Sequence, residues 1–125
     1  MRLLLDTQVC LGCLADAPRW DPTVRRDIEA ADAVFVSAAS IWEASIKAAI
    51  GRLQADPAEL VAGIERSGYE ELPVRAVHAA LVARLPPIHK DPFDRLLVAQ
   101  AVEEPLILVT GDRLLGRYSD LVRVV

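Results

Sequence analysis

The apolar residues of the chain occur in short runs that are separated by longer segments with helical periodicity. The clearest runs, at residues 2–6, 33–37 and 106–110, are typical of strands buried on both faces of a sheet. Weaker runs at 69–72 and 122–125 predict two shorter strands. Because helical segments separate these runs, we expect a three-layer α/β/α fold, in which a parallel sheet of about five strands carries helices on both faces.

Helix boundaries are predicted from capping residues, prolines and glycines. Asp56-Pro57 and Asp91-Pro92 each combine an N-cap carboxylate with a proline at the first helical position. Gly51 and Gly68 suit the position that follows a helix C-terminus, where a left-handed backbone is common. The predicted helices cover residues 9–14, 23–30, 37–50, 56–67, 75–84, 91–103 and 112–117.

Two segments are predicted to be irregular. Residues 17–22 are expected to form a loop, in which Asp21-Pro22 starts the next helix. Residues 85–89 cannot form a regular helix, because the paired prolines lack a backbone donor and restrict the residues before them.

The composition indicates one folded domain that spans residues 1–125. An apolar fraction of 53% and a mean hydropathy of +0.27 are sufficient for a well-filled core. No apolar run approaches the ~18 residues of a membrane span. The N-terminal run reaches the carboxylate of Asp6 too soon for a signal peptide. We therefore expect a cytoplasmic protein with no membrane partner.

The formal net charge of −4 argues against a basic surface that coats nucleic acid. A polyanionic partner would have to be met at a local site or through a bound metal ion.

The two cysteines, Cys10 and Cys13, have the spacing of a redox motif. The residues between them are Leu-Gly instead of the usual Gly-Pro, and two thiols cannot complete a zinc site. His78 and His89 are too far apart for the usual ligand spacing, and neither has an obvious partner in the sequence. We therefore interpret both cysteines as small side chains of the core.

Asp94 is the first candidate site residue. It shares one face of the 91–103 helix with Leu97, Val98 and Ala101, so a carboxylate heads an apolar stripe. Such a group needs a cation or a hydrogen-bond donor to offset the loss of hydration. Two explanations are open at this point: a local one, in which the helix dipole stabilises the charge, and a functional one.

Three more carboxylates are expected at the same edge of the sheet. Asp6 ends the first strand and Asp112 follows the strand at 106–110, and ligands of parallel sheets bind at the carboxyl ends of strands. Glu43 lies near the start of the 37–50 helix. Each has a structural alternative, since Asp6 and Asp112 suit helix starts and Glu43 is spaced to pair with Lys47.

Four carboxylates in close proximity would repel one another unless a cation lay between them. Ligation by oxygen atoms favours Mg²⁺, with Mn²⁺ as the alternative, over zinc or copper. Such a centre is suited to metal-assisted hydrolysis of a phosphodiester bond by an activated water.

Four segments together resemble the PIN-domain nucleases, and among them the VapC-type ribonuclease toxins of bacterial toxin–antitoxin modules. The segments are residues 3–7 (LLLDT), 40–43 (SIWE) with Lys47 and Gly51, 89–101 (HKDPFDRLLVAQA) and 108–112 (LVTGD). The resemblance covers essentially the whole chain, and the 89–101 segment is its most specific part.

The resemblance implies a Mg²⁺-dependent endoribonuclease whose acidic quartet is Asp6, Glu43, Asp94 and Asp112. Asp6, Asp94 and Asp112 are the expected principal metal ligands, and Glu43 either completes the metal site or takes a proton from the attacking water. Thr110 matches a supporting hydroxyl. Asp91 is interpreted mainly as the helix cap, with a supporting role at the site as the lesser alternative.

The resemblance also implies an RNA substrate, a cognate antitoxin and a homodimer. Four basic residues lie near the site in the sequence and are candidates for contacts with phosphates: Lys47, Lys90, Arg95 and Arg113. The chain departs from the family at Gln8, where relatives often carry His, and at Cys13, in a region that is often aromatic. Neither departure affects the quartet.

Two other functions are compatible with parts of the sequence. A two-component receiver domain has a similar size and an acidic Mg²⁺ pocket, but the third strand and the C-terminus supply neither a clear phosphoacceptor nor the required lysine. A catalytically inactive PIN-like module that binds RNA or protein is the remaining alternative. The complete quartet argues against it, because a pure binding module gains nothing from four mutually repelling carboxylates.

Overall fold

The sheet of this protein is parallel throughout, as the sequence predicts. The computed structural model describes residues 1–14 and 22–125. Five strands pair in the order β3-β2-β1-β4-β5. They are β1 (Arg2–Leu5), β2 (Ala33–Ser37), β3 (Glu70–Leu72), β4 (Ile107–Thr110) and β5 (Val122–Val124). The expected three-layer α/β/α class is confirmed.

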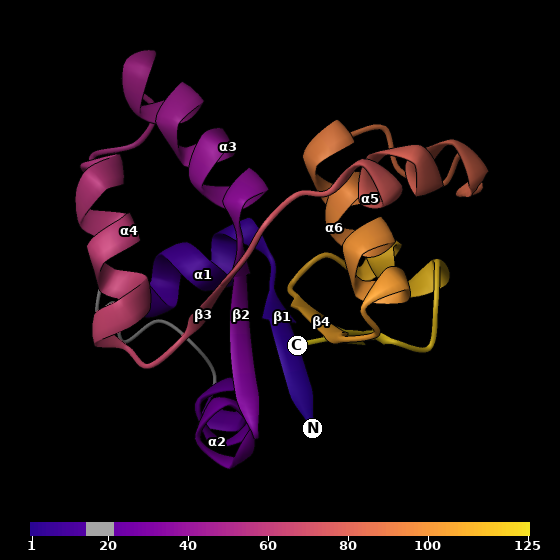
Figure 1. Ribbon diagram of the computed structural model, residues 1–125, viewed down its shortest axis with the longest axis horizontal. Helices are drawn as coiled ribbons and strands as arrows, with labels where there is room; N and C mark the ends of the chain where they lie inside the picture. The colour runs from indigo at the N-terminus through magenta and orange to yellow at the C-terminus, as the bar shows by residue number, and fades with distance from the viewer. Residues whose placement is uncertain (15–21) are drawn as a thin grey trace.

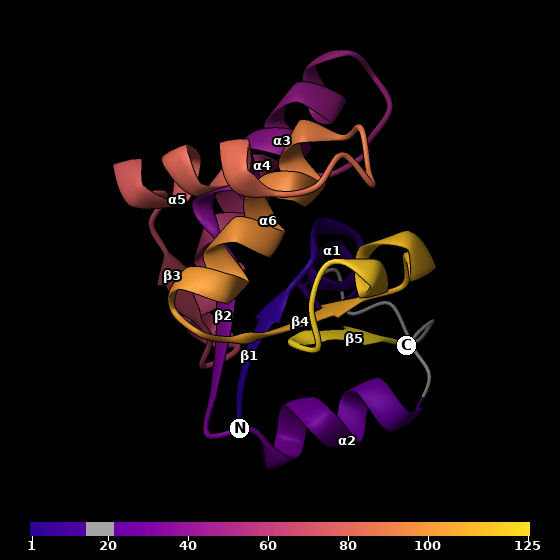
Figure 2. The same cartoon turned by 90° about the vertical axis from the view of Figure 1, so that its right-hand side faces the viewer.

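Helices connect the strands and cover both faces of the sheet. They are α1 (Thr7–Leu14), α2 (Pro22–Ala30), α3 (Ala38–Ala49), α4 (Pro57–Arg66), α5 (Ala76–Leu81) and α6 (Pro92–Glu103), with 3-10 segments η1 (Val82–Arg84) and η2 (Arg113–Arg117). Figure 1 shows α3 continuing beyond the carboxyl end of β2, with α4 to one side and α6 to the other. Figure 2 shows α2 on the opposite side of the sheet from α5 and α6.

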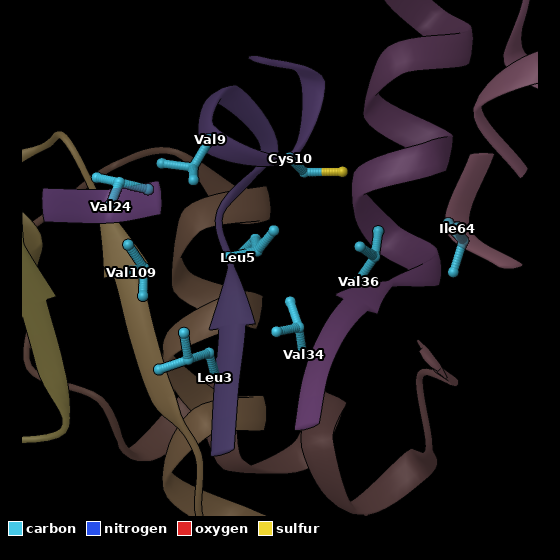
Figure 3. Packing of buried hydrophobic residues seen from close by; sticks show 9 residues of the cluster. All are labelled: Leu3, Leu5, Val9, Cys10, Val24, Val34, Val36, Ile64 and Val109. Carbon is cyan, nitrogen blue, oxygen red and sulfur yellow. The ribbon is translucent and has the colours of Figure 1, made fainter. Parts of the chain in front are cut away.

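The core consists of two apolar layers, because alternate residues of a strand point to opposite faces. Leu3 and Leu5 of β1 pack in the layer shared with α1, α2 and α4, which is drawn in Figure 3. Leu4 points to the other face, where it packs with Leu97 and Val98 of α6. The apolar stripe of α6 is therefore buried as expected, and its N-terminal turn lies at the edge of the sheet.

The caps that the sequence predicts are formed. Asp91 accepts hydrogen bonds from the backbone N–H groups of Phe93 and Asp94, at 2.8 and 3.1 Å, and Asp56 accepts one from Ala58 at 3.0 Å. Gly51 and Gly68 have φ angles of 76° and 74°, in the left-handed region expected after a helix.

Helix lengths differ from the expectation at three places. The predicted 75–84 helix ends as an α-helix at Leu81 and continues as η1, because Leu85 precedes a proline and must be extended. The predicted 112–117 helix is the 3-10 segment η2, and α1 begins two residues before the predicted residue 9. Of the predicted 17–22 loop, residues 17–21 lie outside the described residues, and Pro22 is the first residue of α2.

The expectation that His78 lacks a partner is wrong. His78 is fully buried, and its Nε2 lies 2.6 Å from Oε2 of Glu104. The sequence does not reveal this pair because 26 residues separate the two side chains. The neighbouring Gln100 accepts a hydrogen bond from the Ser37 hydroxyl at 2.6 Å, which ties α6 to the start of α3.

The cysteines are free thiols, with Cys10 buried and Cys13 half-buried. Burial raises the pKa of Cys10 to about 12, so this thiol stays protonated and unreactive at neutral pH. The core role expected for Cys10 is confirmed. Within the described residues, no helix is both long enough and apolar enough to cross a membrane.

Candidate metal centre

Asp6 is held rigidly at the carboxyl edge of the sheet. Its backbone N–H continues the ladder by donating to the carbonyl of Val109 at 3.0 Å. Its Oδ1 accepts from the backbone N–H of Val9 at 2.8 Å, and its Oδ2 accepts from the Thr110 hydroxyl at 2.5 Å. The side chain is buried, and both oxygens have fixed donors. Asp6 therefore caps the following helix, which is the structural alternative for this residue. It also lies close enough to Glu43 and Asp112 for their charges to raise its pKa.

Thr110 and Asp112 form the second part of the edge. The hydroxyl oxygen of Thr110 accepts from the backbone N–H of Asp112 at 3.0 Å, so one threonine contacts two candidate acids. Asp112 caps η2, because its Oδ1 accepts from the backbone N–H of Leu114 at 2.9 Å. The Thr110 hydroxyl therefore links the side chain of Asp6 to the backbone of Asp112.

Glu43 has one paired and one unpaired oxygen. Its Oε2 lies 2.9 Å from Nζ of Lys47, which is the ion pair that their spacing predicts. Its Oε1 is buried and has no hydrogen-bond partner among the residues that the structure describes. A buried oxygen without a partner costs about 1–3 kcal/mol of stability. The ion pair with Lys47 therefore accounts for Oε2 of Glu43 but not for Oε1.

Asp94 lies in the first turn of α6, about three-quarters buried. Burial raises its pKa to about 6, and the negative charges of Asp91, Glu43 and Asp6 add to the effect, whereas His89 opposes it. The pKa of Asp6 is also raised, mainly by burial, with smaller contributions from Glu43 and Asp112. These charge effects link Asp94 with Glu43 and Asp6, and Asp6 with Glu43 and Asp112.

His89 is the residue at this edge that the sequence interpretation missed, and the expectation that it lacks a partner is wrong. Its Nε2 lies 2.8 Å from Oδ2 of Asp112 and 3.5 Å from Oδ2 of Asp94. Ligand atoms of these three residues lie within 4.8 Å of one another. The available signal was proximity in sequence, because His89 lies two residues before the helix cap Asp91.

The four candidate phosphate contacts are placed differently. Lys90 and Arg113 are exposed. Lys47 is engaged with Glu43. The guanidinium of Arg95 donates to the carbonyls of residues 82, 85 and 86 and to the Tyr118 hydroxyl, so it stabilises the segment that leads to His89.

Comparison with known proteins assigns the family. A family model described as PIN domain matches residues 3–121. The chain belongs to the PIN domain family. The resemblance drawn from the motifs is confirmed at this level. No curated protein matches this PIN domain.

Solved structures support the fold of this PIN domain. A chain of VapBC2 from Rickettsia felis, bound to a DNA fragment from its promoter, has a TM-score of 0.73 and 15% identity, covering 100% of this chain and 99% of that chain. DNA-bound VapBC from Salmonella typhimurium has a TM-score of 0.69 and 18% identity, covering 100% of this chain and 97% of that chain. A toxin–antitoxin complex from Klebsiella pneumoniae has a TM-score of 0.65 and 17% identity, covering 98% of this chain and 96% of that chain. At these identities the similarity is one of fold.

The donor set of the PIN domain fits a hard divalent cation. Asp6, Glu43, Asp94 and Asp112 offer only carboxylate oxygens, which Mg²⁺ and Mn²⁺ prefer. Among the described residues the buried Oε1 of Glu43 has no hydrogen-bond partner, and burial with neighbouring carboxylates raises the pKa values of Asp6 and Asp94, so a cation would be favoured here. The protein therefore has the residues for a metal centre at the carboxyl edge of its sheet.

Proposed function

We propose that this protein is a divalent-metal-dependent endoribonuclease, acting through residues 1–125 as one nuclease domain and serving as the toxin of a type II toxin–antitoxin system. The observation that carries the proposal is Glu43, whose buried Oε1 has no partner although its charge acts on Asp94 and Asp6. Lys47 pairs only with Oε2 of this carboxylate, and a cation at Oε1 would stabilise the unpaired oxygen amid the neighbouring carboxylates.

The proposed metal ligands are Asp6, Glu43, Asp94 and Asp112, with Mg²⁺ as the preferred ion and Mn²⁺ as its substitute. A bound divalent ion supplies a nucleophilic water at neutral pH and screens the charge that develops on the scissile phosphate. Thr110 and the Val9 N–H keep Asp6 in one orientation. Asp91 acts as the cap that holds the first turn of α6, and thereby Asp94, in place.

RNA as the substrate follows from the family resemblance, and a centre of this kind is suited to hydrolysis of a phosphodiester bond. Lys90 and Arg113 are exposed and are assigned to phosphate contacts. Lys47 and Arg95 are also candidates for phosphate contacts from the sequence. Both have partners within the fold, so their contribution to RNA binding is secondary in this proposal.

The decisive experiment measures cleavage of a mixed RNA pool by the purified protein with Mg²⁺, with Mn²⁺ and with a chelator. We expect cleavage with either ion, none with chelator, and loss of cleavage in folded Asp6→Asn and Asp94→Asn variants. Glu103→Gln is the matched control, because it removes an exposed carboxylate from the same helix as Asp94. Undiminished cleavage by both folded aspartate variants would refute the mechanism.

A binding module without catalysis predicts a different result: RNA or protein binding with no cleavage of any RNA, whether or not a metal ion is present. The toxin role is tested separately. Expression of the protein should arrest growth of a bacterial host, and expression together with the cognate antitoxin should relieve the arrest through a stable complex. The expected homodimer is measured by light scattering during size-exclusion chromatography.

A further inference from the structure

Both ring nitrogens of His89 are engaged, which defines where its proton lies. Nδ1 accepts a hydrogen bond from the backbone N–H of Asp91 at 3.0 Å. A backbone N–H can only donate, so Nδ1 must carry a lone pair and no proton. The proton of the neutral ring is therefore on Nε2, which faces Oδ2 of Asp112 at 2.8 Å.

This tautomer decides whether His89 can bind a metal ion together with Asp94 and Asp112. His89, Asp94 and Asp112 could hold a metal by distance alone. A neutral His89 could offer the lone pair of Nε2 to a metal only if the ring proton moved to Nδ1, and a proton there would face the backbone N–H of Asp91. Rotating the ring by half a turn would break the hydrogen bond with Asp91 and place a carbon atom in its position.

The hydrogen bond from His89 completes the fixation of Asp112. Oδ1 of this carboxylate accepts from Leu114 N–H at 2.9 Å, and Oδ2 accepts a hydrogen bond from Nε2 of His89 at 2.8 Å. Two donors on separate segments therefore set the plane of the carboxylate. Each oxygen keeps a further lone pair that can face a cation.

His89 is itself anchored. Its backbone N–H donates to the hydroxyl of Tyr118 at 2.7 Å, and the same hydroxyl accepts from Arg95 at 3.1 Å. Arg95 also binds the carbonyls that precede His89. The irregular segment at 85–89 is thus held at both ends, by Arg95 at the carbonyls of residues 85 and 86 and by Tyr118 and the backbone N–H of Asp91 at His89.

We propose that His89 is a positioning residue that donates from Nε2 to Asp112 and orients this carboxylate toward the bound cation, without being a metal ligand. The proposal rests on the proposed metal-dependent function and adds His89 to the residues that orient the four carboxylates. Groups that orient ligands in this way typically contribute roughly 10- to 100-fold to metal affinity.

Two variants of similar shape separate the two nitrogens. In His89→Gln, the side-chain Nε2 is the same number of bonds from the backbone as Nε2 of His89, so the donor to Asp112 can be kept. In His89→Asn, Oδ1 can replace Nδ1 as the acceptor for Asp91, but no donor reaches Asp112. We expect His89→Gln to retain Mn²⁺ affinity within about threefold and His89→Asn to lose about tenfold or more, measured by calorimetry on proteins with confirmed folded spectra.

The tautomer is tested independently on the metal-free protein. Long-range ¹H–¹⁵N correlations of the His89 ring should show a protonated Nε2 and an unprotonated Nδ1. A protonated Nδ1, or an equal loss of Mn²⁺ affinity in both variants, would overturn the proposal. Neither measurement requires RNA cleavage, so a failure of the ribonuclease assignment would be recognised separately.

Discussion

Thr110 donates a hydrogen bond to Asp6 with the two oxygens 2.5 Å apart, although 104 residues separate them. The bond joins the ends of β1 and β4, the two adjacent central strands of the sheet. It lowers the pKa of Asp6 against the effect of burial, so it favours the charged carboxylate that a cation would bind.

The first prediction concerns this bond. Thr110→Val keeps the shape of the buried side chain but leaves Oδ2 of Asp6 without its donor, and we expect Mn²⁺ affinity to fall roughly 10- to 100-fold. Thr110→Ser keeps the hydroxyl and should retain affinity within about threefold. Calorimetric titration of both folded variants measures the difference. Equal affinities for the valine and serine variants would show that the hydroxyl does not prepare Asp6 for the metal.

Much of the fold can be predicted from the sequence because its signals are local. Apolar runs predict the strands, and the caps at Asp56 and Asp91 form where Asp-Pro pairs occur. The four acids could be placed at one edge because parallel strands end together. Each of these inferences needs only neighbouring residues and the topology.

The contacts of the histidines could not be predicted in the same way. His78 contacts Glu104, which lies 26 residues later in the sequence, and His89 contacts Asp112, which lies 23 residues later. Both contacts depend on how the intervening chain folds. The division of the 75–84 helix into α5 and η1 likewise depends on how the chain reaches the paired prolines. Sequence patterns predict elements here, whereas side-chain partners require the packed arrangement.

The second prediction is that Asp94→Asn stabilises the metal-free protein. Because the pKa of Asp94 is raised from 3.8 to about 6, the folded state binds the proton more tightly than the unfolded chain does. The free energy of unfolding therefore falls as pH rises from 3.8 to about 6 and stays low above this range. Removing the charge should recover up to about 3 kcal/mol above pH 6.

Urea denaturation in chelator measures this effect, with Glu103→Gln as the control that should change stability by less than about 0.5 kcal/mol. In saturating Mg²⁺ the order should reverse, because only the wild-type protein gains the full stabilisation from the bound ion. An Asp94→Asn protein that is less stable than wild type in chelator above pH 6 would contradict the raised pKa.

The third prediction is that metal binding releases a proton. Below about pH 6, Asp94 of the metal-free protein is largely protonated and must lose this proton to bind a cation. The affinity for Mn²⁺ should therefore decrease as pH falls through about 6, and the heat of binding should depend on the ionisation enthalpy of the buffer. An affinity that does not change between about pH 5 and about pH 7 would show that Asp94 is not a ligand.

The last prediction separates basic residues that meet RNA from those that support the fold. Lys90→Ala and Arg113→Ala remove exposed cations, so each should weaken RNA binding and reduce the slope of log affinity against log salt by about 1, with unfolding unchanged. Arg95→Ala should instead lower the melting temperature, because it removes the donors for three carbonyls and for Tyr118. The salt dependence of RNA binding is measured with the purified variants in chelator, because removal of the metal ion prevents cleavage. A smaller salt slope for Arg95→Ala than for Lys90→Ala, with a normal melting temperature, would reassign Arg95 to the RNA surface.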